Sequence, residues 1–259
     1  MDLGIAGTRA LVCASSRGLG HACARALAAE GVNVVLNGRD ATLLEQAAAA
    51  LEAQFAVEVR AVCADVTTTE GRAALLAACP TPDILINNNA GPPPGRFASV
   101  DLEGWRAGLE GNLIAAAMLT NAVIQGMCAR RFGRIVNITS AMVTTPRPTM
   151  ALSSAARAGL TAAVKGLSIE VARDNVTINN LLPERFDTDR QRFMAQRVMA
   201  AEGISYEEAR KRQEDSIAAK RLGRPEELGA ACAFLCSRQA GYLTGNNIHL
   251  DGGSYPGLV

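Results

Sequence analysis

The sequence predicts an α/β fold in which a doubly wound parallel sheet has helices on both faces, giving three αβα layers. Short apolar runs alternate with helix-length segments from one end of the 259-residue chain to the other. Neither a linker-like stretch nor an internal repeat interrupts this alternation. Because strand–helix–strand crossovers are right-handed and place their strands in parallel, we expect one domain over residues 1–259.

Each expected element has a local reason. The expected strands are short and apolar, and they cover residues 9–13, 32–36, 57–64, 83–87, 133–140, 176–182 and 246–250. The expected helices cover residues 18–30, 41–53, 69–79, 101–131, 151–174 and 225–237, with short helices between 184 and 224. Gly31 and Pro80 favour helix ends, and Pro225 favours a helix start. Ligands are therefore expected in the loops after the strands, at the carboxyl edge of the sheet.

Composition and charge exclude several classes of protein. The 26 Lys and Arg against 25 Asp and Glu leave a net charge of +1, which is not typical of a nucleic-acid binder. Seven scattered Cys without a Cys-x-x-Cys pair, and only two His, argue against a metal site and for thiols in a reducing cytosol. There is no signal-peptide pattern, and the longest apolar run, residues 113–120, is too short to cross a membrane. We expect a cytoplasmic protein that acts on a small molecule, without a membrane partner.

The loop after the first expected strand has the pattern of a phosphate-binding turn. It reads Cys-Ala-Ser-Ser-Arg-Gly-Leu-Gly over residues 13–20 and leads directly into a helix. Gly18 and Gly20 let backbone N–H groups approach a pyrophosphate at the helix N-terminus, where the helix dipole favours an anion. An ordinary tight turn is the alternative, because this glycine pattern alone is a weak signal.

The end of the second expected strand indicates which dinucleotide binds. An acidic side chain at this position would accept hydrogen bonds from the ribose of NAD(H), but this chain has Asn37, Gly38 and Arg39. Arg17 and Arg39 offer guanidinium groups that can flank a 2′-phosphate. The sequence therefore favours NADP(H) over NAD(H), with two solvated surface arginines as the alternative.

Several motifs together make the sequence similar to the short-chain dehydrogenase/reductase family, close to its 3-oxoacyl-[acyl-carrier-protein] reductases. In the first half of the chain, the family motif T-G-x-x-x-G-x-G corresponds to residues 13–20, its Asp-Val pair to Asp65-Val66, and its N-N-A-G segment to residues 88–91. The family's helix Asn corresponds to Asn112 and its strand-end Ser to Ser140. Near the end, P-G-x-x-x-T corresponds to residues 183–188 and D-G-G to residues 251–253. The resemblance covers essentially the whole chain. It implies a Rossmann-like fold, an NADP(H) cofactor and oxidoreductase activity.

The resemblance also implies roles for individual residues. Asp65 and Val66 would contact the adenine, Thr188 would hold the nicotinamide amide, and Asn112 would anchor an ordered water at a helix kink. The residues assigned to the cofactor are Ala14, Ser16, Arg17, Gly18, Leu19, Gly20, Asn37, Arg39, Asp65, Val66, Asn89, Ala90, Gly91, Arg157 and Thr188. Those assigned to catalysis are Asn112, Ser140, Ser153 and Arg157.

The sequence departs from the family at the centre of its chemistry. The family has a Tyr and a Lys on one helix face, where the Lys lowers the phenol pKa and the phenol exchanges a proton with the substrate oxygen. Here these positions hold Ser153 and Arg157. A serine hydroxyl is shorter than a phenol and a far weaker acid. Arg157 keeps the positive charge and several hydrogen-bond donors, but it cannot relay a proton.

Other departures concern two loops. Ala14 replaces the first glycine of the phosphate loop, at a cost of about 1 kcal/mol if that position requires a positive φ. Glu184 replaces the glycine after Pro183, so its carboxylate lies either near the nicotinamide pocket or, as we expect, on a solvated loop. The chain's three Tyr all lie downstream, and only Tyr206 falls in a variable segment from which folding could bring it back to the site.

These observations lead to an NADP(H)-dependent oxidoreductase that transfers hydride to or from a small carbonyl, alcohol or imine. Its proton would come from Ser140, Ser153, a water held by Asn112, or the substrate itself. The alternatives are a non-catalytic NADP(H)-binding homologue with a regulatory or oligomer-partner role, and a non-redox enzyme that reuses the pocket.

By resemblance, residues 184–224 form a lid. Their 10 basic and 8 acidic side chains are too balanced to demand an anionic substrate. The Ala-rich helices at 101–131 and 151–174 resemble the subunit interfaces of a homotetramer.

Overall fold

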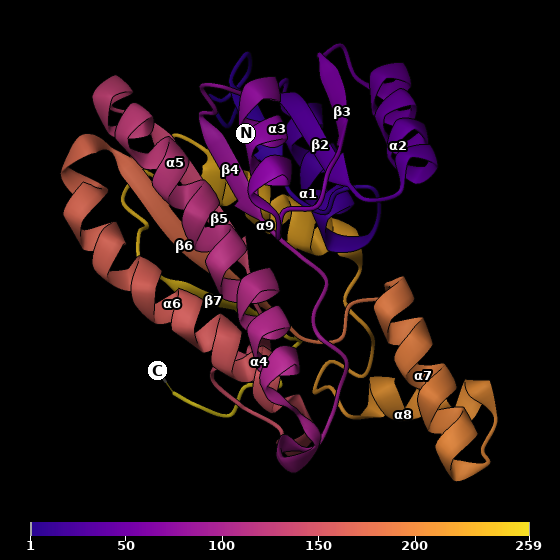
Figure 1. Ribbon diagram of the computed structural model, residues 1–259. Helices are drawn as coiled ribbons and strands as arrows, with labels where there is room; N and C mark the ends of the chain where they lie inside the picture. The colour runs from indigo at the N-terminus through magenta and orange to yellow at the C-terminus, as the bar shows by residue number, and fades with distance from the viewer. Residues whose placement is uncertain (1, 259) are drawn as a thin grey trace.

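A parallel sheet forms the middle layer of the molecule, as the computed structural model of residues 2–258 shows (Figure 1). Within these residues it has seven strands in the order β3-β2-β1-β4-β5-β6-β7, and all neighbours run parallel. The strands are β1 (Arg9–Val12), β2 (Asn33–Gly38), β3 (Val59–Cys63), β4 (Ile84–Asn87), β5 (Gly133–Ile138), β6 (Val176–Pro183) and β7 (Asn247–Leu250). The order reverses between β1 and β4, which places a ligand crevice at their carboxyl ends. The predicted fold class is confirmed.

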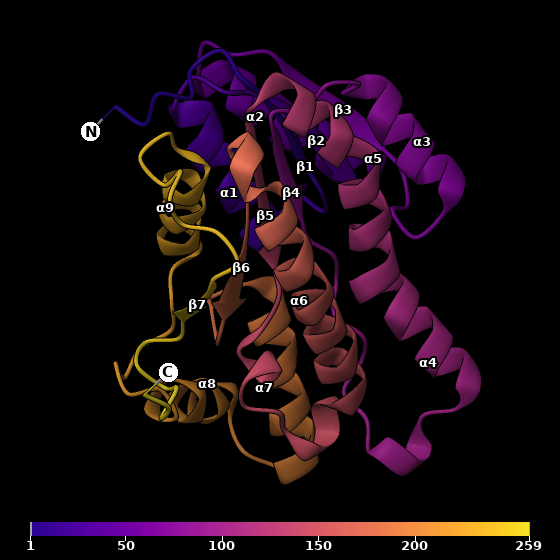
Figure 2. The ribbon, with the colours of Figure 1, turned by 90° about the vertical axis from the view of Figure 1, so that its left-hand side faces the viewer.

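Helices cover both faces of this sheet (Figure 1, Figure 2). One face carries α1 (Gly18–Ala29), α2 (Ala41–Gln54) and α9 (Pro225–Cys236). The other face carries α3 (Thr69–Ala78), α5 (Ala115–Arg130) and α6 (Ala151–Val171), with α4 (Leu102–Leu109) packed against α6. The pair α7 (Asp189–Glu202) and α8 (Tyr206–Asp215) lies away from the sheet, at the bottom of both views. These two helices occupy the predicted lid segment.

Alternation along the strands supplies two apolar layers. Ala10 and Val12 of β1 join the layer beneath α1, α2 and α9, whereas Leu11 joins the layer beneath α3, α5 and α6. Full burial of a Val or Leu side chain contributes about 1.5–3 kcal/mol. The helices α1 and α9 pack so closely that a Cβ on Gly229 would lie 2.5 Å from the carbonyl oxygen of Ala22. Small side chains therefore permit the close helix packing that the composition predicts.

The long helix predicted over residues 101–131 is interrupted. A π-helical turn, Glu110–Ile114, separates α4 from α5. The Asn112 Nδ2 group donates long hydrogen bonds to the carbonyl oxygens of Ala90 (3.4 Å) and Gly108 (3.5 Å). Such turns widen a helix and are frequent at functional sites. The interruption lies where the family resemblance implies a kink.

The stretch from Leu102 to Arg130 is long and apolar enough, by length and composition, to cross a membrane. The sequence expectation rested on an uninterrupted apolar run and missed it. The buried side chains of this stretch, including Leu119, Val123 and Met127, pack beneath the sheet in the layer that α5 shares with α6. In this fold one side of the stretch packs in the core, while Ile114 and Met118 remain exposed.

A row of asparagines crosses half of the sheet. Asn87, Asn137, Asn180 and Asn247 are neighbours in register on β4, β5, β6 and β7. The Nδ2 group of each donates to the Oδ1 atom of the next, at 2.9, 2.9 and 2.8 Å. Asn87 also donates to the Thr120 hydroxyl on α5, which places this asparagine ladder on the α5 and α6 face.

Candidate active site

The loop between β1 and α1 has the geometry of a phosphate cradle. Gly18 has a φ of +62°. A Cβ on Gly20 would lie 2.3 Å from the Ala14 carbonyl oxygen, so only glycine fits there. Ala14 itself has a φ of +46°, so the condition for the expected cost of about 1 kcal/mol is met. Its N–H donates to Asn37 Oδ1 (3.1 Å) and its carbonyl accepts from Asn88 Nδ2 (3.2 Å), and these bonds hold the strained residue in place.

Asn37 supports this loop from below. It is buried, and its Nδ2 group donates to the carbonyl oxygens of Val62 (3.3 Å) and Ala64 (2.8 Å). Its backbone N–H donates to the Ser15 hydroxyl at 3.0 Å. Both polar atoms of the Asn37 side chain therefore already have protein partners. The structure assigns that side chain to the shape of the loop, whereas sequence reasoning assigned it to the cofactor.

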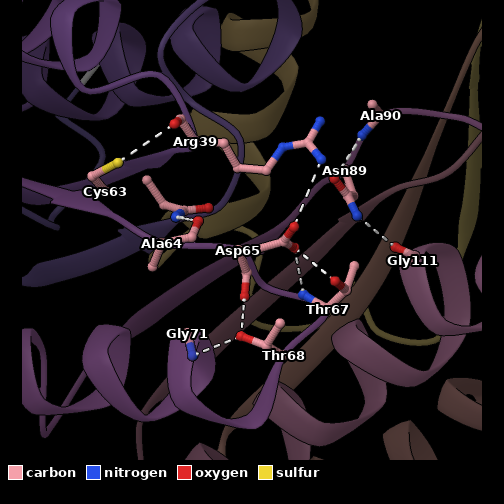
Figure 3. A network of polar contacts seen from close by, with 11 residues as sticks. Arg39, Cys63, Ala64, Asp65, Thr67, Thr68, Gly71, Asn89, Ala90 and Gly111 are labelled. Carbon is pink, nitrogen blue, oxygen red and sulfur yellow. Dashed lines mark hydrogen bonds and ion pairs between the residues drawn. The ribbon is translucent and has the colours of Figure 1, made fainter.

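The two arginines expected at a 2′-phosphate each form an ion pair with a different aspartate. Arg39 Nη1 is 3.6 Å from Asp65 Oδ2 (Figure 3), and Arg17 Nη1 is 3.3 Å from Asp189 Oδ2 on α7. Both arginine side chains are about two-thirds exposed, at 70% and 68%. Exposed pairs of this kind contribute at most about 1 kcal/mol, so a phosphate can displace either acid.

The Asp65 carboxylate is held by Thr67 and Arg39 (Figure 3). Its Oδ1 atom accepts hydrogen bonds from the N–H (2.9 Å) and hydroxyl (2.8 Å) of Thr67. Burial opposes ionisation of Asp65, but these bonds and the charge of Arg39 outweigh it and hold the carboxyl pKa below its ordinary value. Asn89 Nδ2 donates to the Gly111 carbonyl at 3.0 Å, which joins the end of β4 to the π turn.

The residues at the expected Tyr and Lys positions share one face of α6. Ser153 is 4% exposed, and its hydroxyl has no hydrogen-bond partner among residues 2–258. Arg157 Nη1 donates to the carbonyl oxygens of Ile138 (2.8 Å) and Thr139 (2.7 Å), at the end of β5. Its Nη2 donates to the Asn89 carbonyl oxygen at 3.4 Å. The guanidinium thus bridges β5 and the β4 loop, and the backbone takes several of the donors expected for the ribose.

Arg157 is a buried cation. Burial first, and the charge of Arg190 second, lower the pKa of its guanidinium to about 10. It remains protonated at neutral pH. Among the described residues no carboxylate oxygen lies within the 4.0 Å of an ion pair with it. A buried cation without an anion is costly, so the site is electrostatically complete only with a negative charge from a ligand.

Ser140 and Asn112 have different surroundings. The Ser140 hydroxyl accepts from the Met142 N–H at 3.1 Å and caps the short helical turn Ala141–Val143. A cavity of about 20 Å³ is lined by Asn87, Asn112 and Arg157 among others. The Oδ1 atoms of Asn87 and Asn112 are buried without a hydrogen-bond partner in the structure. A cavity of this size holds one water molecule.

Glu184 corrects the sequence expectation. It is 9% exposed, and its Oε1 atom lies 2.9 Å from Arg147 Nη2 and 3.1 Å from Arg185 Nε. The solvated loop was a wrong prediction, because the Glu184 N–H donates to the Leu250 carbonyl and holds the residue against the end of β7. The adjacent Arg185 has a φ of +53°.

Thr188 and the tyrosines complete the list of expected residues. Thr188 precedes α7, and its methyl group lies 4.0 Å from the Cβ position of Gly18, so the lid begins against the phosphate loop. Tyr206 is the first residue of α8. Tyr242 is fully exposed, and Tyr255 stacks on His249 of β7 with ring centroids 4.1 Å apart.

Comparison with known proteins shows the family to which the chain belongs. Residues 13–255 match a family profile described as enoyl-(acyl carrier protein) reductase. The chain is 34% identical over 250 residues to dehydrogenase/reductase SDR family member 4 of Bos taurus, covering 95% of this chain and 86% of the relative. It is 32% identical over 250 residues to the NADPH-dependent reductase BacG of Bacillus subtilis, covering 95% and 96%. The chain belongs to the short-chain dehydrogenase/reductase family.

A solved structure with bound ligands has the same fold. L-Sorbose reductase from Gluconobacter frateurii, complexed with NADPH and L-sorbose, matches with a TM-score of 0.94 and 31% identity over 100% of both chains. Its cofactor agrees with the NADP(H) predicted from Arg17 and Arg39.

Proposed function

We propose that this protein is an NADPH-dependent reductase that delivers hydride to a small carbonyl or imine substrate, or removes it in the reverse direction. The observation that carries the proposal is Arg157, a buried and unneutralised cation at the family's Lys position. It lies at the carboxyl ends of β4 and β5, where this fold binds ligands.

The cofactor site fits a dinucleotide phosphate. The backbone at Gly18 to Gly20 leaves room for a pyrophosphate where a side chain would clash. Arg17 and Arg39 are exposed and only weakly paired, so they are available to a 2′-phosphate, while Asp65 is fixed for the adenosine. When bound, NADP(H) supplies or accepts the hydride.

Arg157 acts through its positive charge, where the Tyr of other family members would donate a proton. Its fixed charge stabilises the negative charge that develops on the substrate oxygen, as oxyanion-hole donors do. The Ser140 hydroxyl accepts from a backbone N–H, so its own proton is free to donate to that oxygen, and the buried Ser153 hydroxyl has the same freedom. Because neither alcohol is a strong acid, the net proton comes from water, including one in the cavity beside Asn112.

A substrate panel tests the proposal. Protein shown to bind NADPH is mixed with carbonyls, imines and activated alkenes, and NADPH oxidation is followed by its absorbance. Turnover of at least one class is expected. Binding without oxidation of NADPH across the whole panel would overturn the proposal.

That negative result would favour the non-catalytic alternative. Its supporting observation is that backbone carbonyls hold three of the Arg157 N–H groups. In that case Ser140→Ala would change no measurable property, whereas a reductase would lose rate. Turnover without net cofactor oxidation would indicate the third alternative, a non-redox enzyme.

We also propose that the segment 184–224 closes over the substrate and that the chain forms a homotetramer. Apolar side chains remain exposed on the Ala-rich helices, including Ile114 (37%), Met118 (45%) and Ile169 (71%). Such faces fit subunit contacts. Light scattering at micromolar concentration should give four times the chain mass, and a monomeric mass would contradict the tetramer. Seven free cysteines are in keeping with the cytoplasm as its compartment.

A further inference from the structure

Most charges of the lid are paired, but three of its basic side chains, Arg190, Arg197 and Lys220, have no carboxylate oxygen within 4.0 Å among residues 2–258. On α7 and α8, Arg192 pairs with Asp187 and Asp189, and Arg210 pairs with Asp187. Arg190, at the start of α7, has no carboxylate oxygen within 4.0 Å among residues 2–258. The overall balance of acids and bases in this segment therefore conceals a local surplus of positive charge.

Arg190 lies beside the reaction site. It comes two residues after Thr188, and its Nη2 donates to the carbonyl oxygen of Pro92 (3.2 Å) in the loop after β4. Its charge is near enough to Arg157 to contribute to the lowered pKa of that guanidinium. A cation of the lid and a cation of α6 thus both bind carbonyl oxygens of the segment that follows β4, Arg190 at Pro92 and Arg157 at Asn89.

Glu184, a buried acid at this edge of the sheet, is paired with neither of them. Glu184 is occupied by Arg147 at 2.9 Å and Arg185 at 3.1 Å, which gives two cations for one carboxylate.

Two hydrogen-bond donors near these arginines also have no acceptor within the described chain. The Nε group of Arg157 has no acceptor among the residues that the structure describes, and neither does the buried Ser153 hydroxyl. Guanidinium groups bind carboxylates through paired, charge-assisted hydrogen bonds. Arg157 and Arg190, which have no carboxylate partner among residues 2–258, are therefore suited to a ligand that carries its own carboxylate.

We propose that the substrate is an oxo acid, whose carboxylate binds Arg190 and whose reacting carbonyl oxygen faces Arg157. This inference rests on the proposed reductase function and specifies its substrate class. A carboxylate fits better than a phosphate monoester, because one lid arginine matches one negative charge. Binding of the carboxylate also holds the first turn of α7 over the site, since Arg190 belongs to that turn.

Matched acids and amides test this proposal by their charge alone. The substrates are 2-oxobutanoate, 3-oxobutanoate and 4-oxopentanoate, each compared with its own amide, and kcat/KM is measured for every pair. At least one acid should be preferred over its amide by about tenfold or more. An acid-to-amide ratio near one for all three pairs would overturn the proposal while leaving the reductase function standing.

Two arginine variants then locate the recognition. Arg190→Gln should lower the acid-to-amide ratio about tenfold, mainly through KM. The control is Arg197→Gln, which removes the same charge two turns further along α7 and should change the ratio less than about twofold. An unchanged ratio in Arg190→Gln, or equal losses in both variants, would contradict a specific role for Arg190.

Binding without turnover separates this inference from the proposed function. Oxamate and malonamate, with oxamide and malonamide as neutral controls, are titrated by calorimetry into NADP⁺-saturated protein. Acid binding that is lost in Arg190→Gln would support the inference even if no substrate turned over. Failure of both acids to bind better than their amides would count against it.

The cofactor's own phosphates are the competing partner of Arg190. NADPH affinity of Arg190→Gln, followed by fluorescence, should stay within about twofold of the wild type. A tenfold weaker affinity with an unchanged acid-to-amide ratio would assign Arg190 to the cofactor and overturn the proposal.

Discussion

The two halves of the site handle charge in opposite ways. At the adenosine end, between β1 and β3, Asp65 is paired with Arg39 and bonded to Thr67, and recognition depends mainly on the backbone of the glycine loop. At the reacting end, between β5 and α7, Arg157 and Arg190 have no acid among residues 2–258. The first half has its charges paired without a ligand, whereas the second contains a buried guanidinium, that of Arg157, with no carboxylate partner among the described residues. The difference supports the proposal that cofactor binding follows the family while proton delivery differs from it.

The largest effect is expected from adding a side chain to the glycine loop between β1 and α1. In Gly20→Ala the new Cβ would lie 2.3 Å from the Ala14 carbonyl oxygen, so the loop must move. NADPH affinity, measured by fluorescence titration, should fall by about 100-fold or more. In the control Gly166→Ala the Cβ meets nothing within 4 Å, so this exposed α6 site should gain about 0.5–1 kcal/mol of stability. Near-normal affinity in Gly20→Ala would show that the loop is not the cradle.

The next largest effect is expected from removing the central cation. Arg157→Met should lower kcat by about 10²–10³, because charge on the substrate oxygen loses its counter-charge. NADPH affinity should change much less, and Arg157→Lys should recover part of the rate. If both variants lose cofactor affinity and keep kcat, Arg157 serves the cofactor alone.

The same cation sets a limit at high pH. The pKa of Arg157 is lowered to about 10, so kcat should be insensitive to its protonation near neutrality and should fall as the pH rises through that value. The Arg157→Lys and Arg157→Met profiles provide the comparison. A wild-type kcat that stays constant as the pH rises through this value would contradict the assignment.

A smaller effect is expected from the hydroxyl groups. Ser140→Ala should lower kcat by about tenfold, since it removes one neutral hydrogen bond to the developing charge. Ser153→Ala tests whether the residue at the Tyr position shares this role, and the double variant shows whether the two act on one oxygen. Additive losses would mean that they act independently.

The smallest effect is expected at the adenosine end. Asp65→Asn weakens the bonds from Thr67 and should cost about 1 kcal/mol in urea unfolding near neutral pH. The folded carboxyl has a lowered pKa, so its contribution is present above the unfolded value and is lost as the pH falls below 3.8. The difference from wild type should therefore shrink in acid. The exposed Glu45→Gln on α2 is the control, and an equal pH-dependent loss there would contradict the assignment to Asp65.

The fold and the cradle were predictable because their signals are local. Strand-like runs, the spacing of Gly18 and Gly20, and the stops at Gly31 and Pro80 are read within a few residues of each other. The partners of charged groups were not predictable in this way. Arg17 meets Asp189 across 172 positions of the chain, and such a pairing depends on how the lid folds back.

Burial was the other source of error. Nothing local distinguishes Glu184 from a loop residue, and only its bond to the Leu250 carbonyl in the folded sheet brings it beneath Arg147 and Arg185. Arg190 was counted within a lid of balanced charge, although the acids near it in the sequence pair with other arginines. Asn87 was not singled out, and its position at the end of β4 was the available signal.

The asparagine ladder has a consequence for how the sheet is assembled. If any of its four strands slipped by one residue, an amide would turn into the apolar layer under α1 and α9, and its neighbours would lose their bonds. The ladder thus favours a single register for the strands β4 to β7. Its last member, Asn247, lies on β7, so the register of all four strands is fixed only once β7 has joined the sheet.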